Sequence, residues 1–252
     1  MTLHRWDPSQ YLRYGDERTR PFLDLLARVP GDARTVVDLG CGPGNDVPPL
    51  RARWPEAAIH GVDSSEEMIA RARADVTDPN AMFASGDAAT WRPSGEQPDV
   101  IVSNAMYQWI DRHIDLLPIA ADGAARAFAF QVPGNQDAPS HVLLAAVAAE
   151  FGVTDFRRVD VRDPAEYLAA LQRPGWDVDV WETTYLHVLQ GPDAVFEWIS
   201  GTGARPVLAG LDGAERDAFV SRYKAELNIA YPPRDFGTVL PFRRIFAVAV
   251  RR

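Results

Sequence analysis

The most constraining feature of the sequence is a regular alternation of short apolar runs with helix-like segments between residues 35 and 132. Runs this short and this apolar are typical of strands that are buried on both faces of a parallel sheet. We predict five such strands, at residues 35–40, 58–63, 82–87, 99–105 and 125–132. Two later runs, 178–189 and 242–252, are rich in aromatic and β-branched residues and read as antiparallel strands. The pattern predicts an α/β fold with a doubly wound, Rossmann-like sheet of seven mostly parallel strands and helices on both faces.

Helical patterns precede, interrupt and follow this core. In SSEEMIARARADV, Ser64 followed by Glu67 has the form of a capping box, which predicts a helix that begins directly after the second strand. Apolar residues at helical spacing also predict a helical cap within residues 1–32 and a helical insertion at 190–235, before the last strand. We expect residues 1–252 to form a single domain, in which residues 33–132 are the cofactor-binding core.

The composition limits the class of protein. The chain has 252 residues, a net charge of −9 and no basic run, so we expect no nucleic-acid partner. No apolar run approaches the ~20 residues of a membrane-spanning helix, and the segment MTLHRWDPSQ lacks the apolar core of a signal peptide. Cys41 is the only cysteine, which excludes an intramolecular disulfide. We expect a soluble cytoplasmic protein with no membrane partner.

The first predicted strand runs into a glycine-rich loop, VVDLGCGPGN, with glycine at positions 40, 42 and 44. Such a loop lets the backbone turn tightly and approach a ligand closely. A dinucleotide fingerprint would require glycine at position 45, where Asn45 stands, and Asp38 would place a like charge near a pyrophosphate. A carboxylate there suits a cationic ligand, and S-adenosylmethionine carries an ammonium and a sulfonium but no phosphate.

Acidic residues also end the next two predicted strands. Asp63 closes the second strand, where a carboxylate can accept hydrogen bonds from ribose hydroxyls. Asp87 ends the third strand, where it can accept a hydrogen bond from an adenine amino group. Nicotinamide-dependent enzymes share the acid at the second strand, but three acids at three successive strand ends favour S-adenosylmethionine.

These stretches, VVDLGCGPG, GVDSSEEMI and GDAATW, resemble the first three motifs of the class I S-adenosylmethionine-dependent methyltransferases. The resemblance covers roughly residues 33–132. In that family the glycine loop wraps the methionine part of the cofactor, and the acids of the second and third strands hold ribose and adenine. The resemblance implies S-adenosylmethionine as cofactor, bound by Asp38, Gly40, Gly42, Gly44, Asp63, Ser64, Met68, Asp87, Ala88 and Asn104.

Segments along the whole chain resemble the trans-aconitate methyltransferase family, and they include segments outside the common fold: WDPSQYLRYGDERTRPFLDLLARVP, SNAMYQWI, WETTYLHVL, WISGTGARPVL and PFRRIFAVAVRR. This resemblance implies methyl-ester formation on a carboxylate of trans-aconitate, with residues 1–32 and 190–235 as a substrate lid. A carboxylate with a pKa near ~4 is already ionised at neutral pH, so we expect no catalytic residue. A tricarboxylate needs cations and hydrogen-bond donors, and the candidates are Tyr11, Tyr14, Arg18, Trp109, Tyr185, Arg205, Arg243 and Arg244.

Other functions stay open on the sequence. The acceptor could be another small carboxylic acid or a hydroxylated metabolite. A cofactor-binding module without catalysis also fits, because the loop and the acids describe binding and not chemistry. Asn45 and Asp38 disfavour a nicotinamide-dependent oxidoreductase. The five histidines show no metal-ligand spacing, so we expect no metal.

Overall fold

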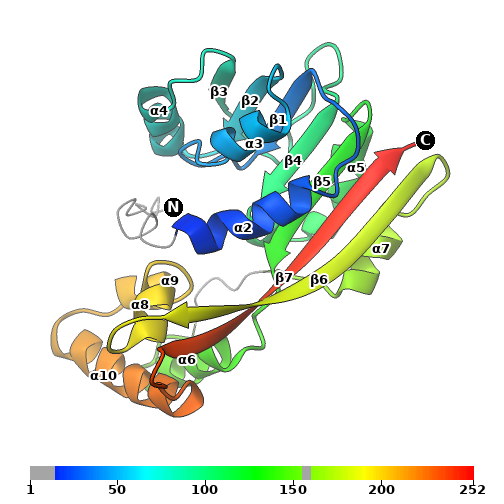
Figure 1. The fold of residues 1–252 in the computed structure, drawn as a ribbon. Coiled ribbons are helices and arrows are strands. Elements are labelled where there is room, and N and C mark those ends of the chain that lie inside the picture. The colour runs from blue at the N-terminus through cyan, green and yellow to red at the C-terminus, as the bar shows by residue number, and fades with distance from the viewer. Residues whose placement is uncertain (1–14, 155–159) are drawn as a thin grey trace. The chain divides into compact units, whose positions relative to one another are not determined.

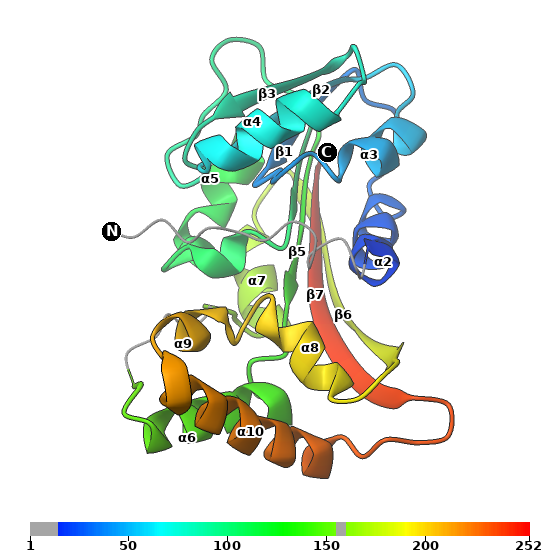
Figure 2. The ribbon, with the colours of Figure 1, turned by 90° about the vertical axis from the view of Figure 1, so that its left-hand side faces the viewer.

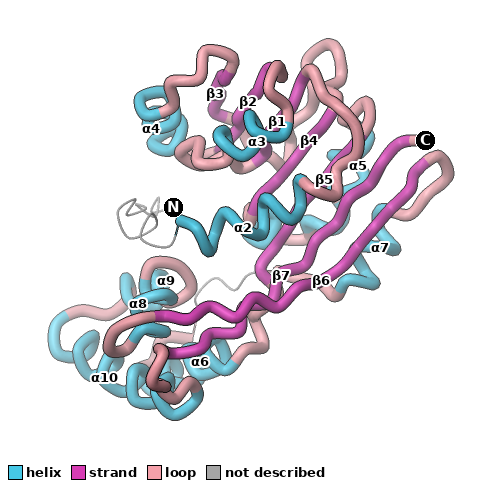
Figure 3. Tube along the Cα trace, viewed as in Figure 1, coloured by secondary structure: helices cyan, strands magenta, loops and turns pink. Residues whose placement is uncertain are grey.

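The computed structural model describes residues 15–154 and 160–252. Its strands form one seven-stranded sheet in the order β3-β2-β1-β4-β5-β7-β6 (Figures 1 and 3). The pairs from β3 to β5 are parallel, and β7 runs antiparallel to β5. The predicted fold class is thereby confirmed. The strands are β1 (Thr35–Leu39), β2 (Ala58–Asp63), β3 (Ala81–Ser85), β4 (Val100–Asn104), β5 (Ala127–Pro133), β6 (Trp176–Leu189) and β7 (Thr238–Arg251).

The chain divides into two compact units, which are described separately. The sheet unit comprises Arg18–Pro133, Val159–Thr183 and Arg244–Arg252. The helical unit comprises Met1–Glu17, Gly134–Arg158 and Thr184–Arg243. Strands β6 and β7 each contribute residues to both units.

Helices cover both faces of the sheet unit. Figure 2 shows α2 and α3 on one face and α5 and α7 on the other. Between the sheet and the second pair lies an apolar core whose Phe128, Phe130 and Tyr167 are fully buried. The elements of this unit besides the strands are α2 (Gly15–Leu26, from Arg18 on), α3 (Val47–Arg53), α4 (Glu66–Asp75), α5 (Leu117–Asp122), α7 (Pro164–Leu171) and the 3-10 turns Tyr107–Trp109 and His113–Asp115.

Helix α4 begins one residue later than the capping-box pattern predicts. Its N-cap is Ser65, whose side chain accepts a hydrogen bond from the Met68 N–H, so the predicted pair of Ser64 and Glu67 is wrong. The reason lies in the residue that ends β2. Asp63 Oδ1 accepts the Ser65 N–H at 2.8 Å, and this turn carries the chain one residue further before the helix starts.

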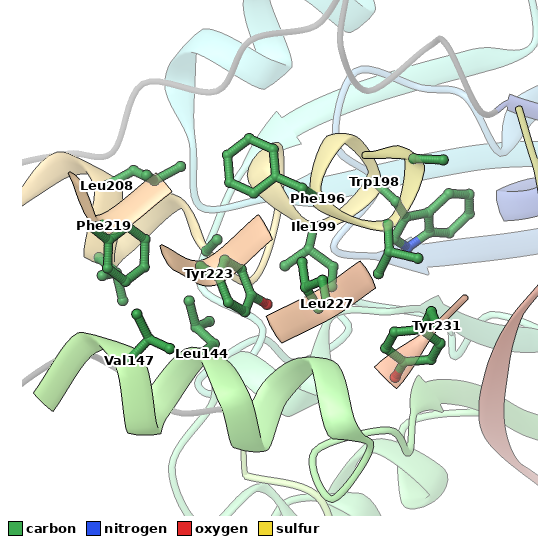
Figure 4. Close-up of a cluster of buried hydrophobic side chains, with 14 of the residues drawn as sticks. Leu144, Val147, Phe196, Trp198, Ile199, Leu208, Phe219, Tyr223, Leu227 and Tyr231 are labelled. Atoms are coloured by element: carbon green, nitrogen blue, oxygen red, sulfur yellow. The ribbon is translucent and has the colours of Figure 1, made fainter. Parts of the chain in front are cut away.

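The helical unit has its own apolar core (Figure 4). Its helices are α6 (Pro139–Glu150), α8 (Ala194–Ser200), α9 (Arg205–Ala209) and α10 (Gly213–Ala230). The predicted 190–235 segment thus contains α8, α9 and α10, and α6 packs against α10 from outside that segment. Two tyrosines fix the start of α6: the Tyr223 hydroxyl donates to the Ser140 carbonyl at 2.7 Å, and the Ser140 N–H donates to the Tyr231 hydroxyl at 3.1 Å.

Candidate active site

The glycine-rich loop follows β1 and has the conformation that its sequence predicts. Gly40, Gly42 and Gly44 have φ values of +81°, +54° and +84°, in the left-handed region that favours glycine. A Cβ on Gly40 would lie 2.3 Å from Cγ of Met106, so this position also needs glycine for packing. A Cβ on Gly42 would meet no atom of residues 15–154 or 160–252 within 4 Å.

Asp63 joins this loop to the start of α4. Its Oδ2 accepts the Gly42 N–H at 2.9 Å, and its Oδ1 accepts the Ser65 N–H at 2.8 Å. The loop is also held by the Val62 carbonyl, which accepts the N–H of Gly40 at 2.7 Å. An ionised carboxylate has about four acceptor positions, so Asp63 can hold the loop and still accept ligand hydroxyls.

Two further carboxylates are buried beside the loop. Asp38 in β1 is 1% exposed, and Asp46 at the start of α3 is 9% exposed. Burial, with the charges of Asp46 and Asp63, raises the pKa of Asp38 well above its usual value. Burial also raises the pKa of Asp46 to about 7, although a hydrogen bond from Asn104 acts to lower it. Negative charge is therefore unfavourable here unless a cation neutralises it.

This electrostatic setting fits a ligand that carries a positive charge and no phosphate. Among the described residues, Asp38 Oδ1 has no hydrogen-bond partner although it is buried. A buried acceptor of this kind is completed by a donor, and a cationic donor also relieves the repulsion between the carboxylates. The same surroundings raise the pKa of Cys41 above its usual range, which keeps the thiol protonated and unsuited to act as a nucleophile.

The residues predicted to hold ribose and adenine lie near the carboxyl ends of β2 and β3. Ser64 is exposed, and Met68 in the first turn of α4 is half-buried. Because β3 ends at Ser85, Asp87 lies in the loop beyond the strand, where it is exposed and its Oδ1 accepts the Ala89 N–H at 2.9 Å. Ala88 packs against the core of the sheet unit.

A line of side-chain hydrogen bonds runs across the sheet from β7 to the glycine loop. Nη1 of Arg244 donates to Oε1 of Gln131 at 3.2 Å. Nε2 of Gln131 donates to Oδ1 of Asn104, at the end of β4. Nδ2 of Asn104 donates to both oxygens of Asp46, at 3.1 and 3.0 Å. The structure thus connects a predicted substrate residue, Arg244, with a predicted cofactor residue, Asn104.

The other predicted substrate residues are distributed over both units. Trp109 is half-buried at the end of a 3-10 turn of the sheet unit. Three lie in the helical unit, where Tyr185 is buried, Arg205 begins α9, and Arg243 donates to the Gly134 carbonyl at 3.3 Å. Tyr11 and Tyr14 lie outside the described residues, and Arg18 is in α2. Their role in substrate binding stays a prediction.

The sequence analysis did not identify Asp46 and Gln131. For Asp46 the signal was an acid directly after the glycine loop, at the N-cap of α3, whose first turn contains two prolines. For Gln131 it was a single amide within the otherwise apolar strand AFAFQVP. A polar side chain in a strand buried on both faces requires a partner, and that requirement marks it for attention.

Within residues 15–154 and 160–252, no three His, Cys, Asp or Glu side chains are grouped so that they could hold a metal ion. Across the same ranges, no helix has the length and apolar character needed to cross a membrane.

Comparison with known proteins is consistent with this site. A family model described as a methyltransferase domain matches residues 36–121, which include the glycine loop, Asp63 and Asn104. The plantazolicin methyltransferase BpumL, solved in complex with S-adenosylhomocysteine, superimposes with a TM-score of 0.54 at 13% identity, over 97% of this chain and 90% of that one. This similarity shows the fold alone. The fold is that of the class I methyltransferases, and the matched family model is a methyltransferase domain.

Relatives along the whole chain narrow the class to one family. The trans-aconitate 2-methyltransferase of Streptomyces avermitilis is 52% identical, over 97% of this chain and 96% of the relative. The trans-aconitate 2-methyltransferase of Streptomyces coelicolor is 49% identical, over 98% of this chain and 87% of the relative. The chain belongs to the trans-aconitate 2-methyltransferase family.

Proposed function

We propose that this protein transfers the methyl group of S-adenosylmethionine to a carboxylate of trans-aconitate and forms a monomethyl ester. The observation that carries the proposal is the group of buried carboxylates around the glycine loop, in a chain of this family. Bound S-adenosylmethionine supplies a methyl group on a positively charged sulfur. In the transfer an oxygen–carbon bond forms as the sulfur–carbon bond breaks, and no proton moves.

The residues of the chain contribute binding and orientation. We assign the cofactor ammonium to Asp38 and Asp46, which are buried and need a cation, and the ribose hydroxyls to Asp63. We assign adenine to Asp87 and Met68. Holding two reactants in line at close approach is worth up to about 7–11 kcal/mol, which is sufficient for an acceptor that is already ionised. No general base is required.

The acid substrate needs positive charge around its carboxylates. We assign its binding site to the sheet unit because Arg244 lies there. A guanidinium that is 5% exposed places a cation where water is largely excluded, and charge-assisted hydrogen bonds to a carboxylate are strong there. We keep the other predicted substrate residues, and the lid formed by residues 1–32 and 190–235, as parts of the same proposal. We also place the reaction in the cytoplasm, in line with the single Cys41.

The proposal is tested by incubating the protein with methyl-labelled S-adenosylmethionine and a panel of acids that includes trans-aconitate, cis-aconitate and citrate. Labelled product that alkali releases as methanol identifies an ester, whereas a methyl ether formed on a hydroxyl group would survive alkali. Asp38→Asn, which keeps the size of the side chain but removes its charge, is expected to lower turnover. Tight binding of S-adenosylhomocysteine without turnover of any acid would contradict the proposal and indicate a cofactor-binding module without catalysis.

A further inference from the structure

The hydrogen-bonded line from Arg244 to Asp46 is directional. Each donor along it points toward the carboxylate end: guanidinium to Gln131, Gln131 to Asn104, and Asn104 to Asp46. The two charged ends fix both amides, because a guanidinium has no acceptor and an ionised carboxylate has no donor. Chemistry therefore permits only this orientation of each amide when both ends are charged.

The side chain of Gln131 is buried, so its amide would be costly without these hydrogen bonds. Gln131 is 1% exposed, and the residues around it in β5 are apolar. Asn104 and Gln131 are direct partners in the β4–β5 ladder, and Pro133 is the partner of Arg244 in the β5–β7 ladder. An apolar residue at position 131 would fill this core without a desolvation penalty, so a core requirement does not explain the amide. The Gln131 amide is explained by the hydrogen bonds that it makes with Arg244 and Asn104.

We propose that Gln131 is a positioning residue that aligns the acid-binding arginine with the cofactor-binding carboxylate. Its amide oxygen accepts a hydrogen bond from Nη1 of Arg244 and so orients the guanidinium. Its other end holds Asn104, which in turn fixes both oxygens of Asp46 for a cationic ligand. This inference rests on the proposed function, and it adds a residue that sets the geometry of both reactants through their own ligands.

The test uses Gln131→Met, which keeps side-chain length but has no hydrogen-bonding amide, and Val132→Ala as a matched control. Val132 is fully buried in the same strand, and its side chain points to the opposite face of the sheet. Gln131→Met should raise the KM for trans-aconitate about tenfold, the effect of losing a hydrogen bond to a charged group. It should also weaken S-adenosylhomocysteine binding several-fold in calorimetry. Val132→Ala should lower the melting temperature and leave both constants within about twofold.

A double-mutant cycle separates positioning from general damage. If Gln131 acts through Arg244, adding Gln131→Met to Arg244→Ala should change KM by less than about twofold, because the contact is already absent. Effects that multiply in the double variant would overturn the proposal. So would a Gln131→Met variant that resembles Val132→Ala in both constants.

Failure of the proposed function and failure of the role of Gln131 give different results. If the wild-type protein methylates no acid, that function fails, and calorimetry with S-adenosylhomocysteine still decides the link from Gln131 to Asp46. Weaker binding in Gln131→Met than in Val132→Ala would support the link, and equal binding would overturn it.

Discussion

Cofactor binding should expel a proton from the buried carboxylates of the glycine loop. Burial raises the pKa of Asp46 to about 7, so the empty site holds a proton on this carboxyl group at mildly acidic pH. An ammonium bound beside Asp46 favours the ionised form and returns the pKa toward its ordinary value of about 4. The proton then leaves as the ligand enters. Asp38, whose pKa burial also raises, acts in the same direction.

The magnitude follows from the fraction of Asp46 that is ionised before binding. With a pKa of about 7, that fraction is about one-eleventh at pH 6 and about one-half at pH 7. The affinity for S-adenosylhomocysteine should therefore rise about fivefold over this interval, and its α-amino group, with a pKa near 7.7–8.0, stays largely protonated throughout. Asp46 alone should release about 0.9 proton at pH 6 and about 0.5 at pH 7, and any release from Asp38 adds to these numbers.

Isothermal titration calorimetry of S-adenosylhomocysteine at pH 6.0, 6.5 and 7.0 measures both quantities. Two buffers with different heats of protonation at each pH give the number of released protons from the difference in apparent enthalpy. Asp46→Asn is the matched control: it keeps an acceptor for Asn104 and should lose the part of the pH dependence that Asp46 causes. An affinity that is constant from pH 6 to 7, with enthalpies that do not depend on the buffer, would refute the reasoning.

Four further predictions test the rest of the site. Asp63→Ala removes the acceptor of two backbone N–H groups and should weaken S-adenosylhomocysteine binding at least about tenfold in calorimetry; unchanged affinity would contradict its role. Gly40→Ala should lower stability toward urea by more than Gly42→Ala, since both have positive φ but only the first would clash; equal losses would speak against the packing argument. Arg244→Ala should raise the KM for trans-aconitate more than the Kd of S-adenosylhomocysteine, and an unchanged KM would place the acid elsewhere. Because the pKa of Asp46 is raised on folding, the wild type loses stability as pH rises from about 4 to 7. Asp46→Asn should therefore stabilise the empty protein at pH 8 by up to about 4 kcal/mol, but not at pH 4. Denaturant midpoints of the two proteins that do not diverge with pH would disprove this.

The sequence was informative wherever the physical cause of a feature is local. Strands β1, β2 and β4 lie within a residue or two of their predicted ends, because a run buried on both faces must be apolar throughout. The positive φ values of the loop glycines follow from the residue type. Asp38 and Asp63 lie near the carboxyl ends of β1 and β2, as predicted, and parallel pairing brings these ends to one edge of the sheet.

What the sequence could not give depends on contacts between distant segments. The bond from Arg244 to Gln131 joins residues far apart in the chain, and it exists only because β7 inserts antiparallel beside β5. Nothing in the local pattern specifies that register. The same holds for α6, which is separated in sequence from α10 and packs against it through apolar side chains. Helix α4 also starts one residue later than predicted, because the Asp63 side chain accepts the Ser65 N–H and forms a turn before the helix.

The features that make this site costly in the empty protein are the ones that suit its proposed ligand. Asp38 and Asp46 are buried carboxylates near one another, and a core of apolar residues in their place would be more stable. The penalty is removed when a cation enters, so the free energy stored in the repulsion becomes part of the binding free energy for a positively charged ligand. A neutral or anionic ligand gains nothing from it. Methyl transfer converts the sulfonium to a neutral thioether, so one of the two positive charges of the cofactor disappears on reaction. The ammonium that we assign to Asp38 and Asp46 is unchanged by the reaction, so these carboxylates are expected to favour the methyl donor and S-adenosylhomocysteine alike.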